Sequence, residues 1–413
     1  MKNNRAVILS ALLLAVLPAG GAGEPELKYV VIVSRHGVRS PTWDKTRLDA
    51  YTTEPWPAWE VPPGNLTPHG RKLIELIGAD YRQWLAGEHL LRTGGCADAR
   101  RIYIHADKEQ RTMETGRAFA ESLAPGCGIE VHSWPDSGPD PLFSGAGKPD
   151  AEKMRAAVSE RLGPDPRKLV ADHRSELDEL QSILGNKLTP EPAVGVALKG
   201  NTVELTGPFA TGSTFSENLL LEYANGMKGS ALGWGHLTRE NLERVMEIHT
   251  VYADLMRRTA YLARVRGSNL LAHVLRSMEQ AAIGKATPGA LGQAGDAVLL
   301  LSGHDSNLSN LSGMLGLSWK LAGYQPDDTP PGGALIFSLW REGGTGRYSV
   351  RLRYVAQSLN QMRYAETLSL TTPPEGQDVA LPGCAVSGCP WEMARQVMEE
   401  AIDPQFTSGG SGR

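Results

Sequence analysis

Two apolar runs that lie far apart in the chain each lead into a motif that contains a histidine. Residues 29–33 read YVVIV, with RHGVRSP at residues 35–41, and residues 297–302 read AVLLLS, with GHDSNL at residues 303–308. Unbroken apolar runs of this kind are typical of strands buried on both faces, as in a parallel sheet covered by helices. Ligands bind beyond the carboxyl ends of such strands, so we expect both motifs to line one cleft.

The first motif places His36 between two arginines, Arg35 and Arg39. A neutral imidazole can attack phosphorus, and guanidinium groups can hold a phosphoryl group in line with it. The pattern Arg-His-Gly-x-Arg-x-Pro fixes five positions and follows a predicted strand. We therefore prefer phosphoryl transfer through a phosphohistidine to the alternative, a surface loop that carries Arg and His by chance.

The first motif resembles the signature of the histidine acid phosphatases, branch 2 of the histidine phosphatase superfamily, and in particular its bacterial periplasmic phytase-like members. Other stretches resemble that family in the same order along nearly the whole mature chain. Each of these later motifs is short, and their order strengthens the resemblance. They are LTPHG at 66–70, QRT at 110–112 with TG at 115–116, GHDSNL at 303–308 and DTPPGG at 328–333.

The resemblance implies a role for each charged residue of these motifs. His36 is the nucleophile, and Asp305 is the general acid that protonates the leaving oxygen. No cofactor and no metal ion are implied, since arginine and histidine charges take the place of a cation. The substrate is a small phosphomonoester. The residues implied to bind its phosphate are Arg35, Arg39, Arg111 and His304.

Three of these residues also have ordinary structural interpretations. Asp305 precedes a helix expected over residues 307–315, and an aspartate that caps a helix would be held ionised by the helix dipole. His304 alone could be a hydrogen-bonded core histidine. Arg111 could be a solvated surface residue, but an arginine at a helix start is unfavourable for the dipole unless an anion lies nearby. The resemblance favours the catalytic roles.

The resemblance also points to substrate contacts and to departures from the family. Thr42 and Glu217 fall where phytase-like members have pocket residues. Trp43 stands where such phytases usually have a lysine, and an indole there would stack on a ring or a lipid-like group. Gly37 matches the phytase-like branch, whereas glucose-1-phosphatases usually carry Asn, and Ser306 replaces a Thr. Trp43 therefore argues against a strict preference for inositol hexakisphosphate.

Three rival functions remain to be compared with a phytase-like acid phosphatase acting on inositol or sugar phosphates. A glucose-1-phosphatase type of sugar phosphatase is the main alternative within the family. A phosphoglycerate mutase also uses an Arg-His-Gly motif, but the export signal and the position of Asp305 argue against it. An inactive polyanion-binding relative is disfavoured because every expected catalytic residue is present.

The N-terminus predicts export. Lys2 and Arg5 precede an apolar stretch at residues 6–17, and small residues follow up to residue 23. The apolar stretch is shorter than a membrane span, so we expect cleavage, a periplasmic or secreted protein, and no membrane contact afterwards. The net charge of −4 indicates no basic surface for nucleic acid. We expect a monomer.

Four cysteines in an exported chain predict two disulfides, and the sequence alone leaves three pairings open. Metal binding is the alternative, but no Cys-x-x-Cys or histidine cluster accompanies the cysteines. The most local pairing is also the one that the family resemblance implies. It joins Cys96 to Cys127 and Cys384 to Cys389.

The periodicity predicts an α/β fold: a doubly wound, mainly parallel sheet flanked by helices, with an inserted α-helical cap domain. Strands and helices alternate before residue 140 and again after residue 296, and a helix begins with Thr67 as N-cap and Pro68 at its first position. Between them, helices are expected at 152–161, 170–184, 213–227, 239–266 and 269–280, with an extended stretch possible at 193–205. The expected division is a signal peptide at 1–23, an α/β domain at 24–139 and 276–405, a cap at 140–275 and a flexible tail at 406–413.

Overall fold

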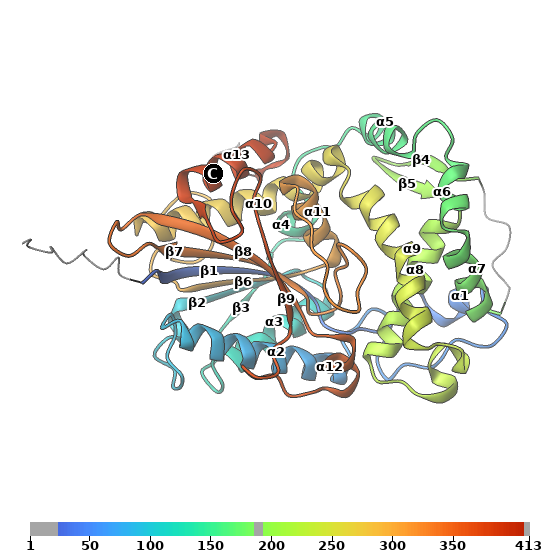
Figure 1. Ribbon diagram of the computed structural model, residues 1–413, viewed down its shortest axis with the longest axis horizontal. Coiled ribbons are helices and arrows are strands. Elements are labelled where there is room, and N and C mark those ends of the chain that lie inside the picture. Colours follow the sequence, from blue (N-terminus) through green and yellow to red (C-terminus); the bar gives the residue numbers. More distant parts are fainter. Residues whose placement is uncertain (1–23, 186–192, 409–413) are drawn as a thin grey trace, which may run out of the picture.

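The computed structural model describes residues 24–185 and 193–408, and it has the α/β fold that the sequence predicts (Figure 1). The predicted signal peptide and residues 409–413 of the predicted tail lie outside this described part. A sheet with helices on both faces forms one part of the molecule, and a group of helices stands beside it.

The sheet has two halves that differ in strand direction. The strands β3, β2, β6 and β1 run parallel in that spatial order, and β7, β8 and β10 continue beyond β1 as antiparallel neighbours, with β9 also paired to β8. The sheet is thus mixed rather than mainly parallel, because β7 and β8 are joined by a hairpin instead of a helical crossover. The strands are β1 (Glu26–Arg35), β2 (Ile102–Ala106), β3 (Val131–His132), β6 (Val298–Gly303), β7 (Ala334–Arg341), β8 (Tyr348–Ala356), β9 (Glu375–Val379) and β10 (Cys389–Pro390).

The register of the parallel half brings the two histidine motifs together. Arg35 at the end of β1 is opposite Gly303 at the end of β6. The amide of His36 donates a hydrogen bond to the Gly303 carbonyl at 2.9 Å. On the other side of β6, Ala106 at the end of β2 lies opposite Ser302. Three parallel strands therefore end at one edge of the sheet, which is where a ligand site is expected.

Alternate residues of β1 are buried under different helical layers. Val31 and Val33 belong to a core that includes α10, whereas Val30 and Ile32 pack in a core with α2 and α3. This two-sided burial explains why the strand is apolar at every position rather than at every second one. In Figure 1, α2 (Pro68–Gly87) and α3 (Gln110–Leu123) cover one face, and α10 (Ala260–Ile283) and α13 (Trp391–Ala401) cover the other.

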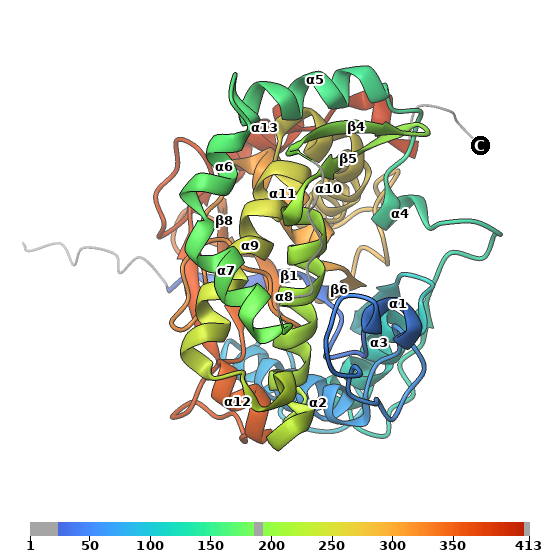
Figure 2. The ribbon, with the colours of Figure 1, turned by 90° about the vertical axis from the view of Figure 1, so that its right-hand side faces the viewer.

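The helices beside the sheet lie in the region predicted as a cap (Figure 2). The stretch at 193–205 is a hairpin, in which β4 (Gly195–Lys199) pairs antiparallel with β5 (Thr202–Thr206). The break predicted at residues 267–268 falls at 258–259, where Arg258 bonds to Ser312 and to the Leu317 carbonyl across the fold. The single helix predicted at 170–184 is two helices that meet at His173. The helices are α5 (Ala151–Leu162), α6 (Arg167–Asp172), α7 (Arg174–Ile183), α8 (Pro208–Ala224) and α9 (Arg239–Arg257).

Short elements complete the fold. The N-cap predicted at Thr67 is present, since its side chain accepts from the Gly70 amide at 2.8 Å. Among the residues that the structure describes, no helix has the length and apolarity needed to cross a bilayer. The remaining helices are α1 (Lys45–Asp49), α4 (Pro141–Ser144), α11 (Asp305–Leu315) and α12 (Leu359–Tyr364), with short 3-10 turns at Ala99–Arg101, Gly229–Ala231, Gly233–Gly235 and Pro404–Phe406.

The cysteines and the chain end are tied into the fold. Disulfides join Cys96 to Cys127 and Cys384 to Cys389, the pairing that the family resemblance implies. The flexible tail was predicted to begin at residue 406, which is too early. Phe406 is buried, and the amide of Ser408 donates to the Asn269 side chain at 2.8 Å, so the chain is packed against α10 up to this point.

Candidate active site

A cleft of about 700 Å³ opens where β1, β6 and β2 end, and α8 and α9 close its opposite side. It brings together six of the predicted site residues and several residues that were not predicted to belong to the site. Arg35 lies directly behind it, almost completely buried. The lining consists of His36, Arg39, Asp107, Lys108, Glu109, Arg111, Gly138, Pro139, Phe143, Ser144, Glu217, Arg257, His304, Asp305 and Ser306.

His36 is held in one orientation by its own backbone. Its Nδ1 lies 2.8 Å from the Gly37 carbonyl, so Nδ1 carries the proton that is donated and Nε2 keeps a free lone pair. Burial, together with the neighbouring charges of Arg35 and Arg111, lowers the pKa of His36 well below its usual value. These influences favour the neutral imidazole, which is the state that a nitrogen nucleophile requires.

The glycine that follows His36 is explained by close packing against α2. A β carbon on Gly37 would lie 2.9 Å from the Gly70 carbonyl oxygen and 2.9 Å from Ile74 Cγ1. A β carbon on Gly70 would in turn lie 2.1 Å from the Val38 carbonyl oxygen. The glycines of the first motif and of the LTPHG motif thus allow two backbone segments to cross in contact. An asparagine at position 37 would not fit without a backbone shift.

Two arginines of the first motif share one carboxylate from α8. Glu217 pairs with Arg35, and its Oε1 lies 3.2 Å from Arg39 Nη2. Arg35 also donates from Nη1 to the Thr329 carbonyl at 2.6 Å. Burial opposes ionisation of Glu217, but Arg39 and Arg35 outweigh it and lower its pKa to about 2. Glu217 is thus a counter-ion for the arginines rather than a store of protons.

The arginines still have donors to spare. The buried Nε atoms of Arg35, Arg39 and Arg111 have no hydrogen-bond partner among the described residues. Unsatisfied buried N–H groups are costly, and charged ones especially so. Arg111 is the second residue of α3, and it lines the same cleft. Three guanidinium groups with unused donors around one cleft form a site for an anion with several oxygens.

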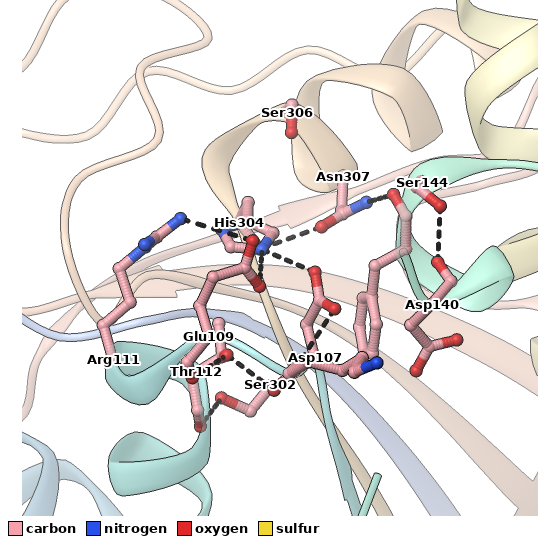
Figure 3. A network of polar contacts seen from close by, with 12 residues as sticks. Asp107, Glu109, Arg111, Thr112, Asp140, Ser144, Ser302, His304, Ser306 and Asn307 are labelled. Carbon is pink, nitrogen blue, oxygen red and sulfur yellow. Dashed lines mark hydrogen bonds and ion pairs between the residues drawn. The ribbon is translucent and has the colours of Figure 1, made fainter. Parts of the chain in front are cut away.

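His304 lies beside His36, with ring centroids 5.6 Å apart. Its Nε2 is 2.8 Å from Asp107 Oδ2 and 3.5 Å from Glu109 Oε2. Figure 3 shows both carboxylates beside the ring. Burial disfavours the imidazolium, yet the bonds to Asp107 and Glu109 raise the pKa of His304. A charged His304 can stabilise negative charge that develops on a phosphoryl group.

Asp107, Glu109 and His304 have donor atoms within 4.8 Å of one another, which is close enough for a shared metal ion. The surroundings favour a proton instead. His304 Nε2 lies 2.8 Å from Asp107 Oδ2, a hydrogen-bond distance, so this nitrogen donates a hydrogen to the carboxylate and offers no lone pair to a metal ion. Arg111 Nη2 lies 3.9 Å from Glu109 Oε1, so a cation already stands next to the cluster.

Asp305 is the first residue of α11, and His304 is its N-cap, so the aspartate is not the cap that one interpretation expected. Its Oδ1 accepts from the Ser306 amide at 2.9 Å, and its Oδ2 is 2.5 Å from Arg257 Nη1. Burial opposes ionisation, but Arg257 and Arg35 hold the pKa of Asp305 well below its usual range. In the free site Asp305 is therefore a carboxylate.

Thr42 and Trp43 lie outside the lining of the cleft. Thr42 is exposed, and it flanks Arg111 across Gly64, whose β carbon would be 3.6 Å from Thr42 and 3.7 Å from Arg111. Trp43 packs edge-on against Phe215, and the guanidinium of Arg47 covers its ring at 3.5 Å from the centroid. The indole face that was expected to stack on a substrate thus carries an arginine of the chain itself.

Sequence reasoning missed Asp107, Glu109 and Arg257. Asp107 directly follows β2, so the rule that located the two histidine motifs could have found it as well. Glu109 is two residues further along. Arg257 ends a long helix of the cap, and nothing in its local sequence distinguishes it from a solvated arginine.

Comparisons with known proteins agree with this site. The family described as the histidine phosphatase superfamily (branch 2) matches residues 26–161 and 208–355. Phytase AppA of Escherichia coli is 35% identical over 95% of this chain and 97% of its own length. A glucose-1-phosphatase of Salmonella typhimurium is 27% identical over 91% of this chain and 92% of its own. The structure of Hafnia alvei phytase in complex with myo-inositol hexakis sulphate superposes with a TM-score of 0.85, at 32% identity, over 93% of this chain and 98% of that chain.

Proposed function

The chain belongs to branch 2 of the histidine phosphatase superfamily and is a phosphoric monoester hydrolase; from this premise we propose that it acts as a phytase-like acid phosphatase through a phosphohistidine at His36. One observation carries the proposal. His36, whose Nε2 is left free by the Nδ1 contact, lines one cleft with Arg39 and Arg111, and these two arginines and the adjoining Arg35 keep buried Nε donors without partners among the described residues.

In the first step, the phosphate oxygens bind to the three arginines and to His304, which places phosphorus against His36 Nε2. The lone pair forms the nitrogen–phosphorus bond while the ester bond breaks, and its electrons stay on the leaving oxygen. The charged His304 stabilises the phosphoryl oxygens during this transfer. Water then attacks the phosphohistidine, and inorganic phosphate leaves.

Asp305 delivers the proton that the leaving oxygen needs, although it is ionised in the free site. A bound phosphate carries negative charge into the cleft, engages the arginines and thereby raises the pKa of the nearby carboxyl. Arg257, which pairs with Asp305, sets how strongly this carboxyl resists protonation. Acidic solution favours the protonated form, in keeping with an acid phosphatase.

The substrate class follows from the family and from two local features. Position 37 has no room for the asparagine that glucose-1-phosphatases usually carry, which favours the phytase-like branch over the sugar phosphatase. Arg47 places a positive charge over Trp43, near the position of the missing lysine. A positive charge there suits a substrate with several phosphates. We therefore propose inositol phosphates as the preferred substrates.

The test compares two substrates on the same enzyme. Turnover of inositol hexakisphosphate is expected to exceed that of glucose 1-phosphate at equal concentration and acidic pH. The reverse order would assign the chain to the sugar phosphatases, and hydrolysis of neither would contradict the proposal.

Three further features are part of the proposal. The α/β domain comprises residues 24–139 and 276–405 and the cap residues 140–275, so that the second boundary falls within α10, whose packing on the sheet continues the α/β domain. The mature enzyme works in the periplasm or outside the cell, which the two disulfides support. We also propose that it acts as a monomer.

A further inference from the structure

A buried histidine of the cap faces the proton donor. His249 lies on α9 and is 2% exposed. Its Nδ1 is 3.0 Å from Ser213 Oγ and 3.3 Å from the Ser213 carbonyl on α8. Its Nε2 has no hydrogen-bond partner among the described residues and lies 3.9 Å from Asp305 Oδ2. This ring is thus oriented at one nitrogen and unsatisfied at the other, and the unsatisfied nitrogen faces a carboxylate.

A protonated ring would satisfy this geometry. Nδ1–H could donate to the Ser213 carbonyl, and Nε2–H could donate to Asp305 after the small approach that closes 3.9 Å to hydrogen-bond distance. A neutral ring also fits, with Nδ1 accepting from Ser213 Oγ and Nε2–H facing Asp305, but only the imidazolium carries a proton that Nε2 can give up to the carboxylate. The position of His249 therefore suits a proton that is held between it and Asp305.

Charged groups from every adjoining element act on this ring. Glu217 on α8 and Asp305 on α11 favour the imidazolium, whereas Arg257 on α9 and Arg35 on β1 disfavour it. Burial is the largest influence, and the pKa of His249 is lower than usual. The imidazolium is consequently a ready proton donor, and it forms only in acidic solution.

We propose that His249 is a positioning residue that holds and supplies the proton which Asp305 delivers to the leaving oxygen; this inference rests on the proposed function. On substrate binding, the proton passes from Nε2 to the Asp305 carboxylate and leaves a neutral imidazole. The carboxyl group transfers it to the bridging oxygen as the ester bond breaks and His36 bonds to phosphorus. In the second step, Asp305 takes a proton from the attacking water and can return it to His249.

The arrangement would resolve a difficulty of the site. Asp305 is ionised in the free enzyme because Arg257 and Arg35 surround it, and yet the reaction needs it as an acid. A proton stored on a buried neighbour is available within the closed cleft, so the carboxylate need not obtain it from solvent. The alternative is that His249 only fills space between α8, α9 and α11.

The experiment uses the mature enzyme with His249→Gln, which keeps hydrogen bonding but cannot titrate, and His249→Leu, which keeps the volume roughly. His273→Gln serves as a matched control, since this half-buried histidine on α10 bonds to the Gly289 carbonyl away from the cleft. Phosphoenzyme formation is measured by rapid quenching in single turnovers, with glycerol 2-phosphate and with p-nitrophenyl phosphate, across the acidic pH range. Circular dichroism and thermal melting monitor folding.

Both His249 variants are expected to lose roughly tenfold to hundredfold in rate on glycerol phosphate, while p-nitrophenyl phosphate, whose leaving group needs no proton, loses less than about threefold. In the wild type, the glycerol phosphate rate falls as pH rises and His249 loses its proton. In His249→Gln this fall is expected to shift to lower pH, because Asp305 must then take its proton from solvent. The control is expected to match the wild type.

Equal losses on both substrates, or an unchanged pH profile and full rate in His249→Gln, would overturn the inference and leave His249 a packing residue. A wild-type enzyme that forms no phosphoenzyme on either substrate would instead overturn the proposed function itself. The two failures are therefore distinguishable within one data set.

Discussion

The two sides of the cleft place their functional residues on different kinds of secondary structure. The sheet side presents His36, Arg39 and His304 at the ends of two neighbouring parallel strands. The cap side presents Glu217, His249 and Arg257 from the lengths of α8 and α9. The sheet side offers positive charge and a nucleophile for the phosphate, and the cap side supplies the countercharge and surrounds the proton donor. We infer that the sheet side determines which reaction takes place. The cap side determines the protonation state of Asp305 and how strongly the arginines are already paired before phosphate binds.

Among changes that leave the nucleophile in place, the largest effect is expected at Asp305, which lies between the two sides. Asp305→Asn should lower phosphoenzyme formation from glycerol phosphate by roughly 100-fold or more, because an alkoxide is a poor leaving group without a proton. The loss on p-nitrophenyl phosphate should be much smaller. Rapid-quench rates on both substrates give the answer. Similar losses on the two substrates would make Asp305 a positioning residue and would contradict the role of the cap side in surrounding a proton donor.

A smaller effect is expected from the cap countercharge. Glu217→Gln frees Arg35 and Arg39 for the phosphate, so inorganic phosphate should inhibit about tenfold more strongly near neutral pH. The depressed pKa of Glu217, about 2, means that its ionised form stabilises the fold above the carboxyl's unfolded pKa, and that this stabilisation is lost as pH falls through about 2. The variant should therefore melt at a lower temperature at pH 6, with a smaller difference in strong acid. Inhibition constants and thermal melts measure both effects, and unchanged phosphate affinity would argue against competition for the arginines.

The segment that carries Trp43 and Arg47, outside the lining of the cleft, should affect substrate choice more than chemistry. Arg47→Ala removes the charge that lies over Trp43, and KM for inositol hexakisphosphate should rise about threefold, the size expected for an exposed ionic contact. KM for p-nitrophenyl phosphate should not change, because a single phosphate is bound deeper in the cleft. Steady-state kinetics on the two substrates test this. An equal rise of KM for both substrates would mean that Arg47 only stabilises the fold of its own segment.

The smallest effect is expected from removing metal ions. Activity should be unchanged after dialysis against excess EDTA, because arginines and a protonated His304 meet the charge of the phosphate. A loss that a divalent ion restores would mean that Asp107, Glu109 and His304 act as metal ligands.

The contrast between the two sides also decides what the sequence could predict. His36 and His304 stand in contiguous motifs directly after apolar strands, and the parallel register then forces them together. The residues of the sheet side could therefore be predicted from the positions of the strand ends. Asp107 follows β2 in the same manner and could have been included.

Apart from Glu217, the functional residues of the cap side could not be predicted from the sequence, because they are spread along helices and form no contiguous motif. His249 and Arg257 are eight positions apart on α9, and each is an unremarkable residue of an amphipathic helix until the helix is packed. Two fold details were missed for a similar reason. Arg258 ends α9 through contacts with residues far along the chain, and the antiparallel half of the sheet depends on pairings that periodicity does not specify.

Trapping the phosphorylated enzyme tests the central claim most directly. Rapid quenching with a phosphate-labelled substrate should yield an acid-labile, base-stable phosphoprotein, and peptide mapping should place the label on His36. His36→Ala should abolish both the label and turnover while the fold, followed by circular dichroism, stays intact. A variant that retains substantial turnover, or a label on another residue, would contradict the account.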